Sequence, residues 1–417
     1  MLKAKEGNFL HIINYSAAAE IKPTPNDRVR RLAIYLDKTV DRYSLGKDEH
    51  YGHVRSLLYF GRGNHYLMNS KVLRSLFKNF TLLRVLKFEF MNGREFKLPD
   101  EVGNLMHLRF LSLKDSMIKA VPSSIANLVC LHTLDLRSRY GYIKIPNRNV
   151  FSKMEKLRHI YLPKHQSARE KRLLFATEAV NLHTVVNIGI QQGSDLDDFV
   201  KLTNVRKLGV ITFDGGEKKL KGTNIIFKHL QSLSVDSRFE DLAIPWNIVL
   251  SCPNIYKLRL RGHITELPED LLCLKNLTKL KLINFGDLKD DHIKVLEKLP
   301  SLRMLFAWSG NFPAHLVCSE GGFPFLEFLS LYSLEFKEWK VEKGAMPSLC
   351  RLHIEFCTLE AVPDGLQYIT TLKELTIGAM LPEFFSRLGE GGEDFYKIQH
   401  VQSVIITNNM RINEQIR

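Results

Sequence analysis

Leu108-Arg109-Phe110-Leu111-Ser112-Leu113 is one copy of a six-residue pattern, Leu-x-x-Leu-x-Leu, that recurs along almost the whole chain. Two other clear copies are Leu131-His132-Thr133-Leu134-Asp135-Leu136 and Leu277-Thr278-Lys279-Leu280-Lys281-Leu282. We call the first apolar residue of each copy its mark, and the marks lie roughly 25 residues apart. They are Val29, Val54, Leu83, Leu108, Leu131, Leu157, Leu182, Val205, Leu230, Ile255, Leu277, Leu302, Leu326, Leu349, Leu372 and Val401.

This spacing predicts one short strand in each repeat. The last three apolar residues of a copy alternate at period two, so one face of the strand is buried and the other faces solvent. A single repeat cannot bury its apolar face alone, and only stacking on the next repeat does so. We therefore expect an α/β solenoid, a leucine-rich-repeat horseshoe of about 16 repeats with a parallel sheet on its concave side.

The returning half of the repeat carries a second regular feature. Six of the 15 prolines follow an apolar residue at one phase of the repeat: Pro99, Pro122, Pro146, Pro245, Pro268 and Pro363. Proline fixes φ near −65° and has no amide hydrogen, which suits the start of a helical turn. These prolines predict short helices or 3-10 turns on the convex side.

The two ends of the chain differ from the repeats. In residues 1–27, Leu2, Phe9, Leu10 and Ile13 are compatible with one face of a short helix, followed by a proline-containing linker. Residues 28–379 form the expected repeat array, with an irregular stretch around Tyr59 to Ser70 and a polar insertion from Asp214 to Gly222. Residues 380–417 are interpreted as an atypical C-terminal capping repeat and tail.

Composition restricts the class of protein. The chain has 59 Lys and Arg against 45 Asp and Glu, a net charge of +14, which indicates an electropositive surface without identifying its partner. No apolar stretch is long enough to span a bilayer, and the first residues do not form a signal peptide. The six cysteines are scattered, which favours reduced thiols, and Cys357 is expected to pack inward. We expect a cytoplasmic location, with a nuclear or membrane-peripheral one left open.

The sequence lacks the common motifs for catalysis and cofactor binding. The pair Gly46-Lys47 lacks the rest of a phosphate loop, and neither Gly-x-Ser-x-Gly, His-Glu-x-x-His nor Cys-x-x-Cys occurs. Asp287, Asp290 and Asp291 with His292 match no metal-binding template, and a solvated helix start is the better interpretation. We expect no enzymatic activity and no cofactor in this chain.

Side chains at the third, fifth and seventh positions of each copy should point out of the concave face. Around Ile255 and Leu277 five of six such residues are basic, and the next two repeats present aromatic residues and methionine there. Apolar groups beside charge are common in protein-binding hot spots. The candidate protein-binding residues are Lys257, Arg259, Arg261, Lys279, Lys281, Met304, Phe306, Trp308, Phe328, Tyr332, Arg351, His353 and Glu355.

Other interpretations of this surface stay open at this point. The aromatic residues can pack on one another, and the basic residues can be solvated or contact a neighbouring domain of the same protein. Nucleic-acid binding is not expected, because no zinc module, basic helix or RNA-binding motif accompanies the basic residues.

The residues between the leucines distinguish one class of repeat protein from another better than the leucines do. The most specific are Val317-Cys318-Ser319-Glu320-Gly321-Gly322-Phe323-Pro324, Pro363-Asp364-Gly365-Leu366, Ile369-Thr370-Thr371-Leu372, the stretches 338–347 and 393–401, and Leu2-Lys3-Ala4-Lys5-Glu6-Gly7-Asn8-Phe9-Leu10. With these, the chain resembles the C-terminal half of plant coiled-coil nucleotide-binding leucine-rich-repeat disease-resistance proteins. The last string resembles the end of that family's winged-helix segment, so residues 1–27 are interpreted as its remnant plus a linker.

The resemblance implies a pathogen-effector sensor whose repeats also restrain an ATP/ADP switch. Its partners would be an effector or a guarded host protein, and the nucleotide-binding domain of the parent receptor. ATP or ADP would bind only an upstream domain that is not part of this sequence. A stand-alone cytosolic scaffold for signalling proteins is the alternative, and a ubiquitin-ligase adaptor is disfavoured because residues 1–27 are too short for an F-box.

Overall fold

The computed structural model describes thirteen stretches of the chain: residues 10–15, 29–36, 52–61, 70–89, 91–138, 143–145, 150–151, 153–164, 181–190, 202–212, 226–237, 244–389 and 391–407. They belong to two compact units, Met1–Leu208 and Gly209–Arg417. Among the described residues, every helix is too short or too polar to cross a bilayer.

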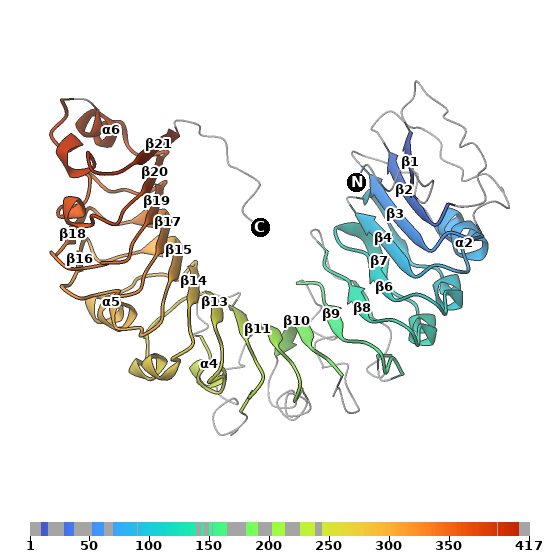
Figure 1. Cartoon of the computed structure of the whole chain (residues 1–417). Helices are drawn as coiled ribbons and strands as arrows, with labels where there is room; N and C mark the ends of the chain where they lie inside the picture. The colour runs from blue at the N-terminus through green and yellow to red at the C-terminus, as the bar shows by residue number, and fades with distance from the viewer. Residues whose placement is uncertain are drawn as a thin grey trace. The chain divides into compact units, whose positions relative to one another are not determined.

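Parallel strands stack in chain order in the first unit (Figure 1). The sheet contains β1 (Leu10–Tyr15), β2 (Arg31–Leu36), β3 (Ser56–Gly61), β4 (Val85–Glu89), β6 (Phe110–Ser112), β8 (Thr133–Asp135), β9 (His159–Tyr161) and β10 (Thr184–Ile190). A separate parallel pair consists of β5 (Met91–Lys97) and β7 (Ser116–Ala120). Strand β11 (Lys207–Thr212) contains the boundary between the units.

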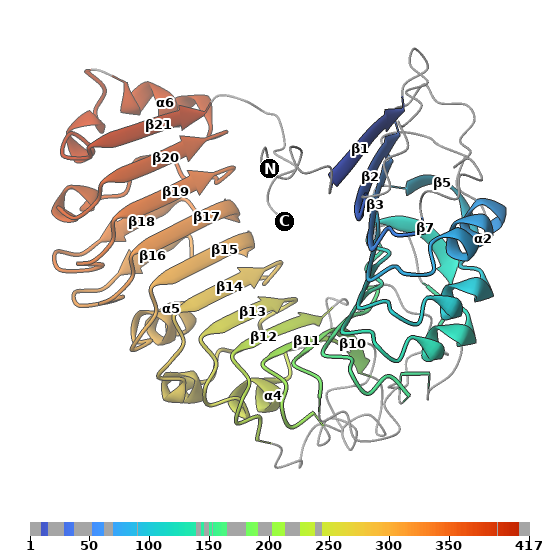
Figure 2. The same ribbon diagram turned by 45° about the vertical axis from the view of Figure 1, so that its right-hand side comes forward.

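The second unit repeats this arrangement, as Figure 2 shows. Its sheet contains β12 (Ser232–Ser237), β13 (Lys257–Arg261), β14 (Lys279–Ile283), β15 (Met304–Asn311), β17 (Phe328–Glu335), β19 (Arg351–Glu355), β20 (Glu374–Gly378) and β21 (Ser403–Thr407). A second parallel pair, β16 (His315–Cys318) and β18 (Glu338–Val341), lies in the returning halves of two repeats.

Each of the 16 marks precedes a strand, and the strand begins two residues after the mark, as from Leu277 to Lys279. Along these strands buried leucines alternate with more exposed side chains, for example Leu280 and Leu282 between Lys279, Lys281 and Ile283. The predicted solenoid of parallel strands is therefore confirmed.

Helical segments occupy the returning halves of the repeats. They are α2 (Ser70–Asn79), η2 (Asp100–Asn104), η3 (Ser123–Asn127), α4 (Trp246–Leu250), η5 (Glu269–Cys273), α5 (Asp290–Glu297), η6 (Leu366–Tyr368), α6 (Pro382–Leu388) and η7 (Phe395–Lys397). Pro99, Pro122, Pro245 and Pro268 each precede the first residue of such a segment. The prediction from the proline phase is confirmed at these four positions. At Pro363 the helical turn η6 begins three residues later, and Pro146 lies outside the described residues.

A residue with positive φ recurs at the eighth position counted from the mark in several repeats, after the strand in some and near its end in others. The non-glycine examples are Asp115, Asn284, Ser309, Ser333, Phe356 and Ala379, with φ between 49° and 56°. After β6, β14, β19 and β20 this left-handed residue turns the chain into the returning half of the repeat, whereas Ser309 and Ser333 lie within β15 and β17, which continue to Asn311 and Glu335. Its regular position is a property of the repeat backbone, because the side chains there share no chemistry.

The expectation of a helix around Leu10 and Ile13 was wrong. Residues Leu10–Tyr15 form strand β1, which pairs in parallel with β2 and so extends the sheet of the first unit. The alternating residues of this segment fit a strand as well as a helix, and the available sheet edge decides between them. The polar insertion from Asp214 to Gly222 and most of the stretch from Tyr59 to Ser70 lie outside the described residues, although Tyr59 to Gly61 belong to β3.

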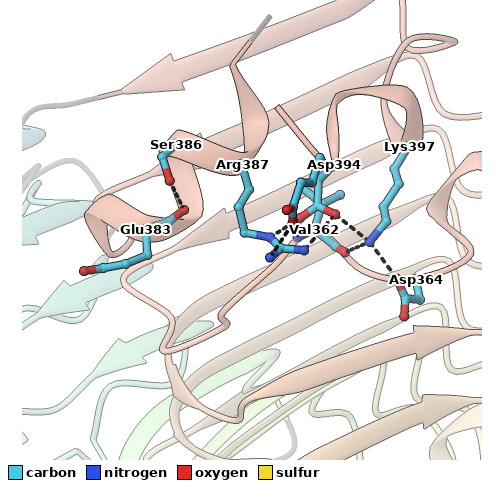
Figure 3. Close-up of polar contacts among 8 residues, drawn as sticks. Val362, Asp364, Glu383, Ser386, Arg387, Asp394 and Lys397 are labelled. Atoms are coloured by element: carbon cyan, nitrogen blue, oxygen red, sulfur yellow. Dashed lines mark hydrogen bonds and ion pairs between the residues drawn. The ribbon is translucent and has the colours of Figure 1, made fainter. Parts of the chain in front are cut away.

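The last repeat carries a buried cluster of charges (Figure 3). The Asp394 carboxylate, 2% exposed, accepts hydrogen bonds from Arg387 Nε at 2.9 Å and from the backbone N–H of Val362 at 3.2 Å. Its other oxygen lies 2.8 Å from Lys397 Nζ, which also donates to Asp364 at 2.6 Å and to the Val362 carbonyl. These bonds join α6 and η7 to the preceding repeat.

Candidate protein-binding surface

The sequence-predicted site residues form a grid on five neighbouring strands of the second unit, β13, β14, β15, β17 and β19. The strand register aligns them in three rows across the sheet. The rows are Lys257, Lys279, Met304, Phe328 and Arg351; Arg259, Lys281, Phe306, Ser330 and His353; and Arg261, Ile283, Trp308, Tyr332 and Glu355. The predicted residues therefore come together on one surface, which we call the strand-face patch.

Basic and aromatic side chains of the patch contact one another where β14 meets β15. Lys281 Nζ lies 3.0 Å from the centroid of the Trp308 ring and 5.8 Å from that of Phe306. Lys279 Nζ lies 4.6 Å from the Phe306 centroid. Ammonium groups over the faces of aromatic rings are attracted by the ring quadrupole. The two halves of the patch are thus joined through cation–π contacts.

The aromatic residues also pack on each other. The Phe306 centroid is 5.1 Å from that of Phe328 and 5.9 Å from that of Trp308, and Trp308 lies 6.2 Å from Tyr332. Trp308 Nε1 donates a hydrogen bond to Ser330 Oγ at 3.2 Å. Such contacts hold the rings in fixed orientations and so reduce the side-chain entropy that binding at this surface would cost.

The expectation that Phe328 points openly into solvent was wrong. Its side chain is 8% exposed because the ring lies between Phe306 and His353, under the Arg351 guanidinium at 5.2 Å. Phe328 therefore supports its neighbours and offers little surface to a ligand. Met304, Phe306, Trp308 and Tyr332 are half-buried and keep part of their side chains accessible.

Acidic side chains lie close to basic residues of the patch only at its two margins. Arg259 donates to Ser234 Oγ at 3.1 Å and lies 4.0 Å from an Asp236 oxygen, and burial lowers the pKa of this guanidinium. At the other margin, His353 Nε2 lies 3.2 Å from Glu374 Oε1. No described carboxylate forms an ion pair with Lys257, Lys279 or Lys281. The centre of the patch is therefore positive and suited to an acidic partner group.

Lys281 should titrate close to the physiological range. Burial lowers the pKa of its ammonium to about 8, and the charges of Arg259 and Lys279 contribute further lowering. We expect NMR titration of the Lys281 side chain to give a midpoint near 8, and Arg259→Gln to raise that midpoint because one neighbouring cation is removed. A Lys281 midpoint above about 10 would contradict this environment.

The buried cysteines and the acidic residues at the start of α5 have structural roles. Burial raises the pKa of Cys252, Cys318 and Cys357 to about 12, so these thiols are not reactive nucleophiles at neutral pH. Cys357 is 3% exposed, which confirms its inward packing. Asp290 and Asp291 form the first turn of α5, which confirms the helix start. In the part of the chain that the structure describes, no group of three or more His, Cys, Asp or Glu could hold a metal ion.

Comparisons with known proteins agree with this fold. A family model described as "Leucine-rich repeat region" matches residues 53–386. The Arabidopsis thaliana "Probable disease resistance RPP8-like protein 2" is 34% identical over 421 residues, which cover 97% of this chain and 44% of the relative. The Arabidopsis "Disease susceptibility protein LOV1" is 35% identical over 411 residues, with the same two coverages. The chain thus spans less than half the length of these relatives.

A solved structure of a leucine-rich-repeat protein from Leptospira interrogans superposes with a TM-score of 0.50 at 16% identity, over 87% of this chain and 93% of that one. At this identity the likeness concerns the fold alone. The family model covers most of the chain, and the relatives match it nearly end to end. The chain belongs to the leucine-rich-repeat family, and its sequence is that of the repeat region of plant disease-resistance proteins.

Proposed function

We propose that this chain is a non-catalytic protein-recognition module that acts in plant disease resistance. Its relatives are named as disease-resistance and disease-susceptibility proteins, and they support this role. The observation that carries the proposal is the strand-face patch, in which unpaired lysines lie against partly exposed aromatic rings. A fixed aromatic surface beside positive charge fits a protein ligand that presents acidic and apolar groups together.

Within a longer receptor this surface would serve two ligands. One is a pathogen effector, or a host protein that the effector modifies, and the other is the nucleotide-binding domain, held inactive until the ligand displaces it. The ATP or ADP of that switch would bind the nucleotide-binding domain and not this chain. A stand-alone signalling scaffold is the alternative function, and the same patch would then bind a signalling protein.

Exchanging residues 257–355 between allelic versions of the receptor tests recognition. We expect a cell-death assay in leaves to show that effector specificity moves with this stretch, because it contains the whole patch. A chimera that keeps the specificity of its remaining sequence would contradict the proposal. Exchange of residues 52–138, which lie in the first unit, is the matched control and should leave specificity unchanged.

Charge reversal tests the autoinhibitory contact separately. In a full-length receptor, Arg259→Glu with Lys281→Glu should cause cell death without an effector, because the reversed charges repel the acidic surface that the patch holds. Lys373→Glu, exposed and four repeats away from Lys281, is the control and should remain silent. Silence of the double variant, with normal protein accumulation, would exclude this contact and leave the ligand role to be judged by the exchange.

A further inference from the structure

The last strand of the second unit, β21 (Ser403–Thr407), has one free edge. It pairs in parallel with β20 on one side, and no strand in the described part of the chain pairs with its other side. Figure 1 shows it as the last arrow of the second unit. All five of its residues are exposed, unlike those of the strands before it.

The core-facing residues of β21 are apolar but uncovered. The strand register places Val404 beside Leu375 and Ile406 beside Ile377. Leu375 and Ile377 are 0% and 1% exposed, whereas Val404 is 37% exposed and Ile406 is 50% exposed. Repeat arrays need a polar outer face where they end. Because β21 keeps the apolar residues of an inner repeat instead, its outer edge offers a surface that another strand can cover.

This edge also lacks the features that keep exposed strands from pairing. Natural edge strands usually carry a charged side chain, a proline or a bulge. Residues 401–410 contain no ionisable side chain and no proline, and β21 pairs with β20 without a shift of register. Every residue of β21 after Ser403 is β-branched, which favours a strand. The sequence of β21 is therefore suited to pairing with a further strand.

The backbone of β21 directs hydrogen-bonding groups to its outer edge. The amide of Ser403 donates to the Lys373 carbonyl at 3.0 Å, and the Thr407 carbonyl accepts from the backbone N–H of Ala379 at 3.2 Å. These groups therefore point toward β20. Because the N–H and C=O groups of successive strand residues point alternately to the two sides, those of residues 404 and 406 point away from β20. The outer edge thus presents two donors and two acceptors.

The chemistry of β21 is the same when the strand is read in either direction. On both sides of Ile405 lies a β-branched apolar residue, followed by a hydroxyl residue at the end of the strand. Antiparallel pairing of two copies about Ile405 would therefore place Val404 opposite Ile406 and Ser403 opposite Thr407. Each pair of Val404 and Ile406 would exchange two hydrogen bonds through the outward-pointing groups. The strand is thus complementary to itself in residue type and in hydrogen bonding.

We propose that β21 pairs antiparallel with β21 of a second copy of this chain, about a two-fold axis at Ile405. The sheets of the two second units would then continue into one another, and Val404 and Ile406 would cover the same residues of the other copy. Five residues from each copy make a contact much smaller than the roughly 20–30 residues a side of a standard interface. The dimer should therefore be weak and depend on concentration. The strand-face patch lies on other strands and takes no part in the pairing.

Sedimentation velocity of the 417-residue chain tests the proposal directly. The weight-average mass should rise from the 48.1 kDa of one chain toward twice that value between roughly 5 and 200 µM. A mass that stays at one chain over this range would overturn the proposal. A chain shortened to residue 407 should dimerise equally well, because it keeps all of β21. Loss of the dimer on this deletion would assign the contact to residues 408–417 and would also overturn the proposal.

A charge at the two-fold axis tests where the two copies meet. Ile405→Lys places like charges opposite each other and should weaken the dimer about tenfold or more. Thr376→Lys adds the same charge at the register partner of Ile405 on β20 and is the control. Its two copies would lie about 14 Å apart, beyond the screening length, so the affinity should change less than about twofold. Equal effects of the two variants would place the contact elsewhere.

Proline distinguishes strand pairing from contact between side chains alone. Ile406→Pro removes an outward N–H, and proline is tolerated in an edge strand at such a position, so the chain should fold but lose the dimer. Circular dichroism checks the fold. Ile406→Thr keeps the N–H and the β-branched shape and should weaken the dimer about threefold or less. An equal loss in both variants would show that the backbone does not pair.

Disulfide cross-linking tests the register. In a Cys273→Ser background, which removes an exposed thiol, Ile405→Cys should link two copies on mild oxidation. Opposite residues of such a non-hydrogen-bonded pair have Cα atoms about 4.5 Å apart, within reach of a disulfide. Thr407→Cys should link at least tenfold more slowly, because its two copies would lie about 13 Å apart. Equal rates would overturn the antiparallel pairing about Ile405.

Discussion

Replacing Asp394 by asparagine is expected to destabilise the C-terminal end of the second unit by about 3 kcal/mol, because the buried ammonium of Lys397 and the half-buried guanidinium of Arg387 lose their shared carboxylate. The Lys397 side chain is 5% exposed, so water cannot replace the lost partner, and only the exposed Asp364 and the Val362 carbonyl remain. The measurement is urea unfolding combined with hydrogen exchange of the amides in residues 382–407, which should lose protection first.

Glu393→Gln is the matched control for this prediction. Glu393 also pairs with Arg387, at 2.9 Å, but its side chain is 76% exposed, and exposed pairs contribute less than about 1 kcal/mol. If both substitutions cost the same small amount, the buried charges do not hold the last repeat. A large loss of stability for Asp394→Asn alone would show that the charged cluster holds α6 and η7 against the preceding repeat.

The same cluster predicts an acid-sensitive end of the array. Burial works to raise the pKa of Asp394, but hydrogen bonds from Arg387 and Lys397 outweigh it, so the pKa is lowered overall. A carboxylate with a lowered folded-state pKa contributes stability above its unfolded value near 3.9, and this stability is lost as the pH falls through the folded value. Asp394→Asn should therefore reduce the loss of protection on acidification below about pH 4.

The leucine spacing predicted the repeat array closely, and the physical reason is local. A mark and the alternation after it specify which face of a strand is buried, so each of the 16 strands begins two residues after its mark. The proline phase likewise predicted helical segments, because a fixed φ acts on the next few residues. At Leu10–Tyr15 the same reasoning failed, since an apolar pattern in so short a segment does not separate helix from strand.

The chemistry of the strand-face patch was only partly predictable. The position of each residue within its repeat was enough to place Lys281 and Trp308 on one face of the sheet. The cation–π contact between them, however, depends on the register of β14 against β15. The burial of Phe328 depends on His353 and Arg351, which belong to another repeat. Such contacts join residues more than 20 positions apart, so a pattern within one repeat does not specify them.

Phe285→Ala is expected to destabilise the second unit by about 3–5 kcal/mol, because the ring is fully buried and its removal leaves a cavity. Its centroid lies 5.8 Å from that of Phe312, which lies 5.7 Å from Phe336, so the ring begins an aromatic column through successive repeats. Thermal and urea unfolding measure the loss. Phe325→Ala, at a ring that is 54% exposed, is the control and should cost less than about 1 kcal/mol.

Gly310 contacts the same ring and allows a second test of how Phe285 is packed. A Cβ atom added at Gly310 would approach the Phe285 ring to 2.5 Å, so Gly310→Ala in β15 should also destabilise the unit, by about 1–3 kcal/mol through overpacking. In the double variant the methyl group enters space that the missing ring has vacated, so the two costs should not add. Simple additivity would show that the two residues do not meet. A coupling of 1 kcal/mol or more, by contrast, would mean that this ring sets the position of the strand bearing Met304, Phe306 and Trp308. The strand-face patch would then depend on a core contact on the other side of the sheet.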